Sequence, residues 1–180
     1  MKCAVLVNGV PASGKSTVAQ ALVAELLASG KAAVPLGLDT IKEGLFAHLG
    51  TGDRDYNRKL GRASYQAIFN SVAEFPDDLL PVIDAWHGFQ PATVLRGHLK
   101  HAKIERVAEI WVRIVPRIAA ERYRTRATKR HAGHPPASYA EELLALAERA
   151  RPIALGPVIE VDGAGPAPFD LANRVLAALE

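Results

Sequence analysis

Residues 9 to 16 read Gly-Val-Pro-Ala-Ser-Gly-Lys-Ser, an uninterrupted G-x-x-x-x-G-K-[ST] motif. Glycines at this spacing let backbone N–H groups turn inward around phosphate oxygens, and a following helix directs its positive dipole end at them. The Lys15 ammonium can reach the β- and γ-phosphates of a nucleoside triphosphate, and the Ser16 hydroxyl can ligate Mg²⁺. The residues predicted to bind the nucleotide here are Gly9, Pro11, Ala12, Ser13, Gly14, Lys15, Ser16 and Thr17.

Two acidic residues end apolar runs and could supply further chemistry. Asp39 follows Leu36-Gly37-Leu38, and Asp84 follows Leu79-Leu80-Pro81-Val82-Ile83. Ligands collect at the carboxyl ends of the strands in a parallel sheet, so both acids are expected near the phosphates. We predict that Asp84 holds Mg²⁺ together with Ser16, and that Asp39 orients and deprotonates an acceptor hydroxyl. The alternatives are a capping or turn role for Asp84 and a helix-dipole role for Asp39.

The densest positive charge lies in residues 122 to 131, which read Arg-Tyr-Arg-Thr-Arg-Ala-Thr-Lys-Arg-His. Arg122, Arg126 and Arg130 recur at i, i+4 and i+8, so they share one side of a helix. An arginine stripe that leads into a Gly- and Pro-containing tip at 131 to 137 is typical of a lid over a transferring phosphoryl group. We predict that Arg122 and Arg126 contact ATP and that Arg126 is catalytic. A solvated surface face is the alternative.

Other residues could contact the acceptor. Trp86 follows the third apolar run and could stack on an acceptor ring, although core packing is the alternative; the neighbouring His87 is an alternative base. A second stripe with i, i+4, i+8 spacing consists of Arg54, Arg58 and Arg62. If this stripe faces the pocket, the acceptor is anionic; the alternative is that it forms a solvated face of the helix. The residues predicted to bind the acceptor are Asp39, Lys42, Arg62, Trp86 and His87.

These side chains need a framework that brings them together. The first apolar run precedes the glycine-rich motif directly, and Val18, Leu22 and Leu26 after it repeat at helical spacing up to Gly30. Alternation of strand-like runs with helical patterns predicts an α/β fold, with a five-stranded parallel sheet, helices on both faces and a short helical lid. The predicted strands are 3 to 8, 33 to 38, 79 to 84, 107 to 115 and 157 to 161.

The boundaries and faces of several helices can also be predicted. Thr40 with Glu43, and Ser138 with Glu141, have capping-box spacing, and Pro116 suits the first turn of a helix. Apolar spacing predicts buried faces that include Ala63 and Ala67 in a helix over 55 to 75, and Phe169 in a last helix near 168 to 179.

The length of 180 residues predicts a single domain over 1 to 180, with an acceptor-binding insertion at about 40 to 78 and a lid at about 122 to 138. A formal net charge of +3 does not by itself favour nucleic acid binding. No apolar run reaches the roughly 18 residues of a membrane span, and the single cysteine suits a reducing compartment. We therefore expect no membrane association and a cytoplasmic location, while the sequence leaves the oligomeric state open.

The segments Gly9 to Thr17, Leu36 to Glu43 and Arg122 to Arg130 together resemble small P-loop kinases of the adenylate-kinase-like group. The resemblance is strongest to chloramphenicol phosphotransferase and uncharacterised AAA-type predicted kinases, with polynucleotide, gluconate and zeta-toxin kinases more distant. It implies ATP and Mg²⁺ as cofactors, Asp39 as the base toward the acceptor hydroxyl, and an adenine site near Val161-Asp162-Gly163.

We therefore predict an ATP-dependent kinase that transfers the γ-phosphoryl group to a hydroxyl of a small molecule, preferably a neutral sugar or an antibiotic-like alcohol. The enzymatic alternatives are a polynucleotide 5′-hydroxyl kinase and a nucleoside monophosphate kinase. The alternative from another class is a P-loop ATPase or switch that acts on a protein partner.

Overall fold

The computed structural model describes all 180 residues and contains a five-stranded sheet in which all neighbouring strands are parallel. The order across the sheet places the strand before the glycine-rich loop at the centre. The predicted sheet is thus confirmed, and the strand ends agree with the predicted ones to within two residues. The strands, in sheet order, are β2 (Ala33–Gly37), β3 (Leu80–Asp84), β1 (Cys3–Asn8), β4 (Arg106–Arg113) and β5 (Val158–Asp162).

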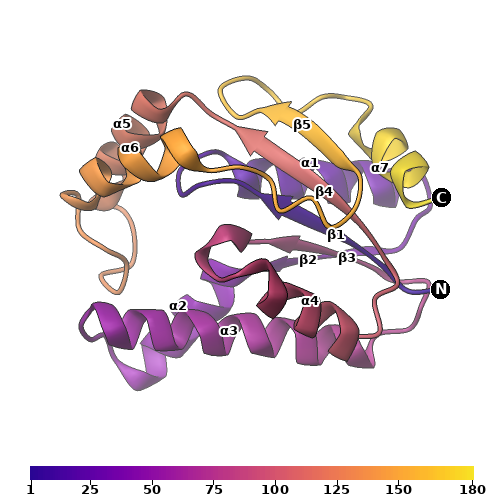
Figure 1. The fold of residues 1–180 in the computed structure, drawn as a ribbon, viewed down its shortest axis with the longest axis horizontal. Helices are drawn as coiled ribbons and strands as arrows, with labels where there is room; N and C mark the ends of the chain where they lie inside the picture. The colour runs from indigo at the N-terminus through magenta and orange to yellow at the C-terminus, as the bar shows by residue number, and fades with distance from the viewer.

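Seven α-helices and one short 3-10 helix connect the strands. The helices are α1 (Lys15–Ala28), α2 (Leu38–Leu49), α3 (Arg54–Glu74), α4 (Ala92–His101), α5 (Pro116–Ala127), α6 (Tyr139–Arg149) and α7 (Leu171–Leu179), and the 3-10 helix is His87–Phe89. Helices α1 and α7 cover one face of the sheet, and α3 and α4 cover the other (Figure 1). The helices α5 and α6 form a pair beyond the carboxyl ends of the strands, at the left of Figure 1.

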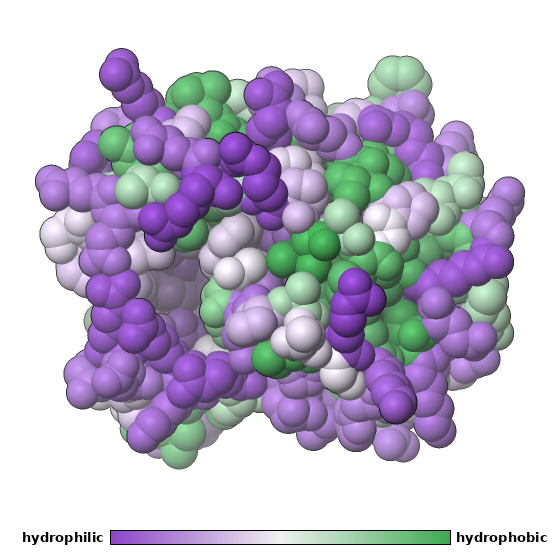
Figure 2. Space-filling view, viewed as in Figure 1, coloured by the Kyte–Doolittle hydropathy of each residue, from purple (hydrophilic) through white to green (hydrophobic).

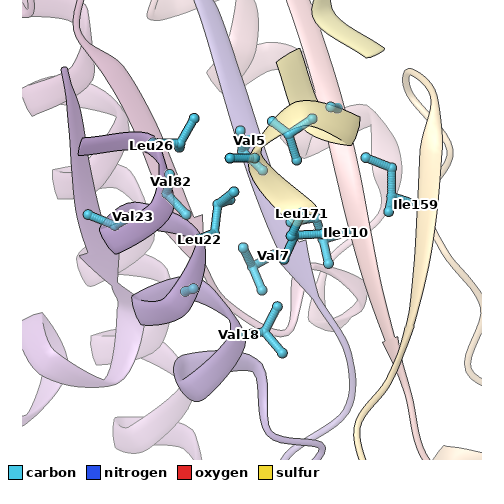
Figure 3. Close-up of a cluster of buried hydrophobic side chains, with 14 of the residues drawn as sticks. Val5, Val7, Val18, Leu22, Val23, Leu26, Val82, Ile110, Ile159 and Leu171 are labelled. Carbon is cyan, nitrogen blue, oxygen red and sulfur yellow. The ribbon is translucent and has the colours of Figure 1, made fainter. Parts of the chain in front are cut away.

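The central strand β1 is buried on both faces, which is why its sequence reads as a continuous apolar run. Its Val5 and Val7 pack into the cluster that includes α1 and α7, while Leu6 packs on the side of α3 and α4. Figure 3 shows Leu22 and Leu26 of α1 among these side chains. The helical spacing predicted for α1 is therefore confirmed, and this packing fixes the position of the glycine-rich loop between β1 and α1.

The predicted capping boxes do not form. Helix α2 begins at Leu38 directly after β2, with Gly37 as its N-cap, so Thr40 already lies in the first turn. Ser138 does stand at the N-cap of α6, but its backbone is helical and its side chain makes no capping hydrogen bond. The prediction that Pro116 opens a helix is correct, because α5 begins there.

Two predicted buried faces are partly wrong. In α3, Ala63 and Ala67 are exposed, because the buried stripe is shifted by one position to include Ser64 and Tyr65. Phe169 is 93% exposed because α7 begins only at Leu171, so Phe169 lies outside the helix that would turn it inward.

None of the helices combines the length and the apolar character needed to span a membrane.

Candidate active site

A cleft of about 1390 Å³ lies at the carboxyl ends of the central strands, between the glycine-rich loop, α2, α3 and the α5–α6 pair. Figure 2 shows it as a hollow at the left with a mainly hydrophilic rim. Its volume exceeds that of typical single-ligand pockets, so it has room for two ligands side by side. The predicted site residues that line it are Pro11, Ala12, Gly14, Lys15, Ser16, Thr17, Asp39, Lys42, Arg62, Asp84, Trp86 and Arg126.

The glycine-rich loop has the backbone that a phosphate cradle needs. Gly9 and Gly14 have φ of +154° and +101°, which side chains disfavour, and a Cβ on Gly9 would meet the Val112 carbonyl at 2.7 Å. Gly9 and Ser13 support the loop from beneath and do not line the cleft. Helix α1 begins without a side-chain cap or an acidic residue in its first turn, so its first N–H groups can meet an anion.

Lys15 is the buried cation of the cleft. Its Nζ donates to the carbonyl of Val10 over 3.1 Å. Burial lowers the pKa of Lys15 below its ordinary value, and the carboxylates of Asp84 and Asp39 oppose this effect. The three predicted side chains therefore lie within electrostatic range of one another, although they come from three separate segments of the chain.

Asp84 and Ser16 supply oxygen donors suited to Mg²⁺. Burial raises the pKa of the Asp84 carboxyl, while Lys15 and the neighbouring Ser16 hydroxyl lower it. No cluster of three or more His, Cys, Asp or Glu side chains that could hold a metal occurs anywhere in the chain. With one hydroxyl and one carboxylate as donors, Ser16 and Asp84 fit a cation that keeps waters and phosphate oxygens as most of its ligands, as Mg²⁺ does.

Asp39 lies in the first turn of α2 and is 59% exposed to the cleft. Its Oδ2 accepts a hydrogen bond of 2.7 Å from Arg130, the last arginine of the predicted stripe. The structure thus joins the predicted base to the lid, a contact that links residues 91 positions apart.

Lys42, Arg62 and Trp86, which are predicted to bind the acceptor, all line the cleft. The Lys42 Nζ donates to Asn57 Oδ1 over 2.6 Å, and burial lowers the pKa of Lys42. Arg62 is exposed at the surface of α3, and Trp86 packs near Trp111 with ring centroids 6.3 Å apart. Arg54 and Arg58 also line the cleft, where they pair with Glu142 and Asp55.

The structure contradicts the placement of His87 in the acceptor site. Its side chain does not line the cleft and is 2% exposed. Its ring hydrogen-bonds to the Tyr65 hydroxyl at 2.6 Å and to the Ile83 carbonyl at 3.3 Å. Burial lowers the pKa of His87 to about 4. The 3-10 helix turns the side chain back into the core, so His87 is a structural residue and not an alternative base.

The predicted lid arginines separate into two groups. Arg126 lines the cleft and lies within electrostatic range of Lys15. Arg122 does not line the cleft, because its Nη1 donates to the Gly163 carbonyl over 2.7 Å. It therefore braces the loop after β5, so a direct contact with ATP is not supported for Arg122.

The lid tip, residues 131 to 136, packs on α2 and α3. Asn57 donates to the carbonyl of Gly133, and Phe46 stacks on His131 with ring centroids 5.2 Å apart. His134 hydrogen-bonds to Glu43 at 2.6 Å. These contacts close the end of the cleft that lies between the lid tip, α2 and α3.

Sequence reasoning missed Asn57, Glu43 and His134 in this region. Asn57 and His134 belong to no motif, and the sequence indicates Glu43 only as part of a helix start. The packing of the lid on α2 and α3 brings the three together. Only Glu43 could have been found from the sequence, because it lies one helical turn after Asp39, on the same side of α2.

A buried polar network behind the loop was also missed. The Asn8 side chain accepts from the Gly9 and His87 backbone N–H groups and donates to Glu109 over 2.7 Å. Glu109 also accepts from the backbone of Ile153 and Ala154, just after α6. This network ties the start of the glycine-rich loop to the chain that leaves the lid.

The parallel sheet of order β2-β3-β1-β4-β5, the glycine-rich loop between β1 and α1, and the helical pair over the cleft define a P-loop kinase fold. The sequence model of the adenylylsulphate kinase family matches residues 1–124, and the chain belongs to this family. The matched range contains the loop, Asp39 and Asp84 but ends within α5, before most of the lid.

Similar solved structures share the fold. A protein from Chloroflexus aurantiacus J-10-fl described as a "putative kinase" has 23% identity, with 99% of both chains covered and a TM-score of 0.82. The protein APE1195 has 19% identity, covering 99% of this chain and 97% of its own, with a TM-score of 0.63. The Deinococcus radiodurans tunicamycin resistance protein has 16% identity, covering 98% and 95%, with a TM-score of 0.57. No curated protein matches the chain.

These comparisons support a kinase-like P-loop protein and a phosphotransferase. The closer resemblance to chloramphenicol phosphotransferase and the identity of the acceptor remain predictions.

Proposed function

We propose that the protein transfers the γ-phosphoryl group of ATP to a hydroxyl group of a small molecule. The observation that carries this proposal is the meeting of Lys15, Asp39 and Asp84 in one cleft, each within electrostatic range of the others. Phosphoryl transfer needs a positioned donor, neutralised charge and an oriented nucleophile, and these three side chains can serve those three needs.

Each residue has a defined part in this scheme. The glycine-rich loop and Lys15 hold the phosphates, while Ser16 and Asp84 hold the metal ion. Bound Mg²⁺ would supply charge neutralisation at the phosphate oxygens. Asp39 orients the acceptor hydroxyl and takes its proton, and Arg126 of the lid balances the negative charge of the transition state.

The enclosure of the acceptor end favours a small molecule over a polymer end. The lid tip is bonded to α2 through His134 and Glu43, and Arg54 of α3 is paired with Glu142 of α6. In the predicted arginine stripe of α3, only Arg62 has no carboxylate partner. The cleft therefore offers a single unpaired cation from this stripe, and we retain a hydroxyl-rich neutral acceptor as the preferred class.

The direct test is a screen of ADP release with sugars, nucleosides, nucleoside monophosphates, aminoglycosides, phenicol-type alcohols and 5′-hydroxyl oligonucleotides. We expect a small hydroxyl compound to raise turnover above the acceptor-free rate. Stimulation only by oligonucleotides, with a steep salt dependence of binding, would identify a polynucleotide kinase instead. Stimulation only by a protein partner would identify an ATPase or switch.

Replacement Asp39→Asn tests the base. It should lower acceptor-stimulated kcat by about 100-fold or more, since general-base catalysis contributes roughly 10²- to 10⁴-fold, while the Kd for ATP stays unchanged. Asp55→Asn is the matched control, because Asp55 is also an acid in the first turn of a helix but does not line the cleft. An equal loss of kcat in both variants would show that the loss does not depend on the position of Asp39 in the cleft. Unchanged turnover in Asp39→Asn would show that Asp39 is not the base.

A further inference from the structure

Four side chains form one hydrogen-bonded line that starts at α2, passes through the lid and returns to α2. In order, they are those of Glu43, His134, Arg130 and Asp39. Glu43 Oε1 lies 2.6 Å from His134 Nε2, and His134 Nδ1 lies 3.1 Å from Arg130 Nη2. The same Arg130 nitrogen lies 2.7 Å from Asp39 Oδ2. The two central members are less exposed than the two ends: the His134 side chain is 4% exposed and that of Arg130 is 19% exposed.

The donors and acceptors allow one arrangement of protons. A guanidinium has donors only, so His134 Nδ1 must accept the bond from Arg130 and carry a lone pair. The neutral imidazole then has its proton on Nε2, where it donates to the Glu43 carboxylate. A proton on Nδ1 would set N–H against N–H and break the contact with Arg130.

The surroundings of His134 favour this neutral form. The charged groups that face it are Asp39, Lys42 and Glu43 from α2 and Arg130 from the segment before the lid tip. Burial is the largest influence and lowers the pKa of His134, and the two cations act in the same direction. The carboxylates of Asp39 and Glu43 raise the pKa of His134, but the pKa stays below its ordinary value.

We propose that His134 is a positioning residue for the phosphoryl transfer: it fixes the Arg130 guanidinium, which in turn holds Asp39 Oδ2 and leaves Oδ1 free for the acceptor hydroxyl. The inference rests on the proposed role of Asp39 as the base. Because His134 comes from the lid tip, Asp39 is oriented only when the lid lies on α2. Lid closure and assembly of the base are thus one event.

The hydrogen-bonded line can be tested without any acceptor. The ¹⁵N chemical shifts of the imidazole report its tautomer and its titration, with the His134 signals assigned by their loss in His134→Gln. We expect a proton on Nε2 and none on Nδ1 at pH 7, with protonation of His134 at a lower pH than for a free histidine side chain. A proton on Nδ1, or a cationic ring at pH 7, would overturn the proposal.

Two substitutions separate orientation of Arg130 from anchoring of the lid. His134→Gln retains a donor near the Nε2 position toward Glu43 but loses the acceptor for Arg130. His134→Asn retains an acceptor near the Nδ1 position but loses the donor for Glu43. We expect His134→Gln to lower kcat about 10-fold with an unchanged KM for ATP. His134→Asn, which keeps the acceptor for Arg130, should lower kcat less than His134→Gln does and raise the acceptor KM, because the anchor to Glu43 is lost.

His101→Gln is the control, because His101 is exposed at the end of α4 and far from the cleft, and its kcat should match that of the wild type. Equal kcat for His134→Gln and His134→Asn would overturn the positioning role. If no acceptor stimulates the wild type, the proposed function has failed, whereas the imidazole spectra still decide whether the hydrogen-bonded line exists.

Discussion

At the scale of single residues, position in the fold decides which of several similar side chains can do chemistry. Arg122, Arg124 and Arg126 lie on one short helix, yet they face three different surroundings. Arg122 binds a backbone carbonyl, Arg124 pairs with Glu121 at the surface, and Arg126 lines the cleft. Of the three, only Arg126 is placed to contact a ligand in the cleft.

This contrast gives a prediction with an internal control. Arg126→Ala should lower kcat by about 100-fold or more, because lid arginines that balance transition-state charge contribute up to about 10³-fold or beyond. Arg124→Ala, on the same helix two residues away, should leave kcat within about 2-fold. Both constants come from steady-state ADP release with the best acceptor. Similar kcat values for the two variants would show that Arg126 is not a catalytic residue.

At the scale of elements, the loop after β5 supports the glycine-rich loop from behind. A Cβ on Gly163 would meet the backbone oxygen of Ser13 at 2.1 Å, so the two loops are in direct backbone contact. Arg122 of α5 holds the same loop through the Gly163 carbonyl. The Ser13 hydroxyl beside this contact is buried without a hydrogen-bond partner.

Gly163→Ala should therefore displace the glycine-rich loop and weaken nucleotide binding. We expect the Kd for ATP, measured by calorimetry, to rise by about 10-fold, since backbone on both sides leaves the methyl group no room. Gly165→Ala is the matched control two residues away, because no atom lies within 4 Å of the added Cβ. The prediction fails if both variants bind ATP as the wild type does.

At the scale of the whole molecule, buried polar groups link the layers behind the cleft. His87 lies under β3 and bonds to Tyr65 of α3, while its backbone N–H donates to the Asn8 side chain next to the glycine-rich loop. The pKa of His87 is lowered by burial to about 4, against 6.5 for the free side chain. The unfolded chain therefore takes up a proton at a pH where the folded protein does not.

This difference predicts a loss of stability in mild acid. Burial of neutral His87 leaves the free energy of unfolding unaffected by pH above about pH 6.5. As the pH falls from 6.5 to about 4, the free energy of unfolding decreases by about 3 kcal/mol, at about 1.4 kcal/mol per pKa unit. Urea unfolding of the wild type should show this slope between pH 7 and 4. His87→Gln should be less stable at pH 7 but show a shallower slope, and His101→Gln should retain the wild-type slope. An unchanged slope in His87→Gln would show that His87 does not cause the loss of stability in acid.

Sequence analysis predicted most of the fold because its signals are local. The apolar run of β1 predicts a strand buried on both faces, and the spacing of Val18 and Leu22 predicts the packed face of α1. The failures concern places where neighbouring elements decide the outcome. Thr40 does not cap α2, because β2 passes into that helix without a turn, and His87 points into the core because the 3-10 helix rotates it away from the cleft.

The sequence by itself determined the alternation of strands and helices in a parallel α/β sheet and the loop from Gly9 to Thr17, because these follow from patterns in which residues adjacent in the chain also act together. Only the tertiary structure decided which side chains meet at the lid end of the cleft. Lid residues such as His134 and Arg130 meet Glu43 and Asp39 across 91 positions of sequence, and no local pattern records such a contact. It arises because the lid folds back over α2, where burial and charge pair these side chains.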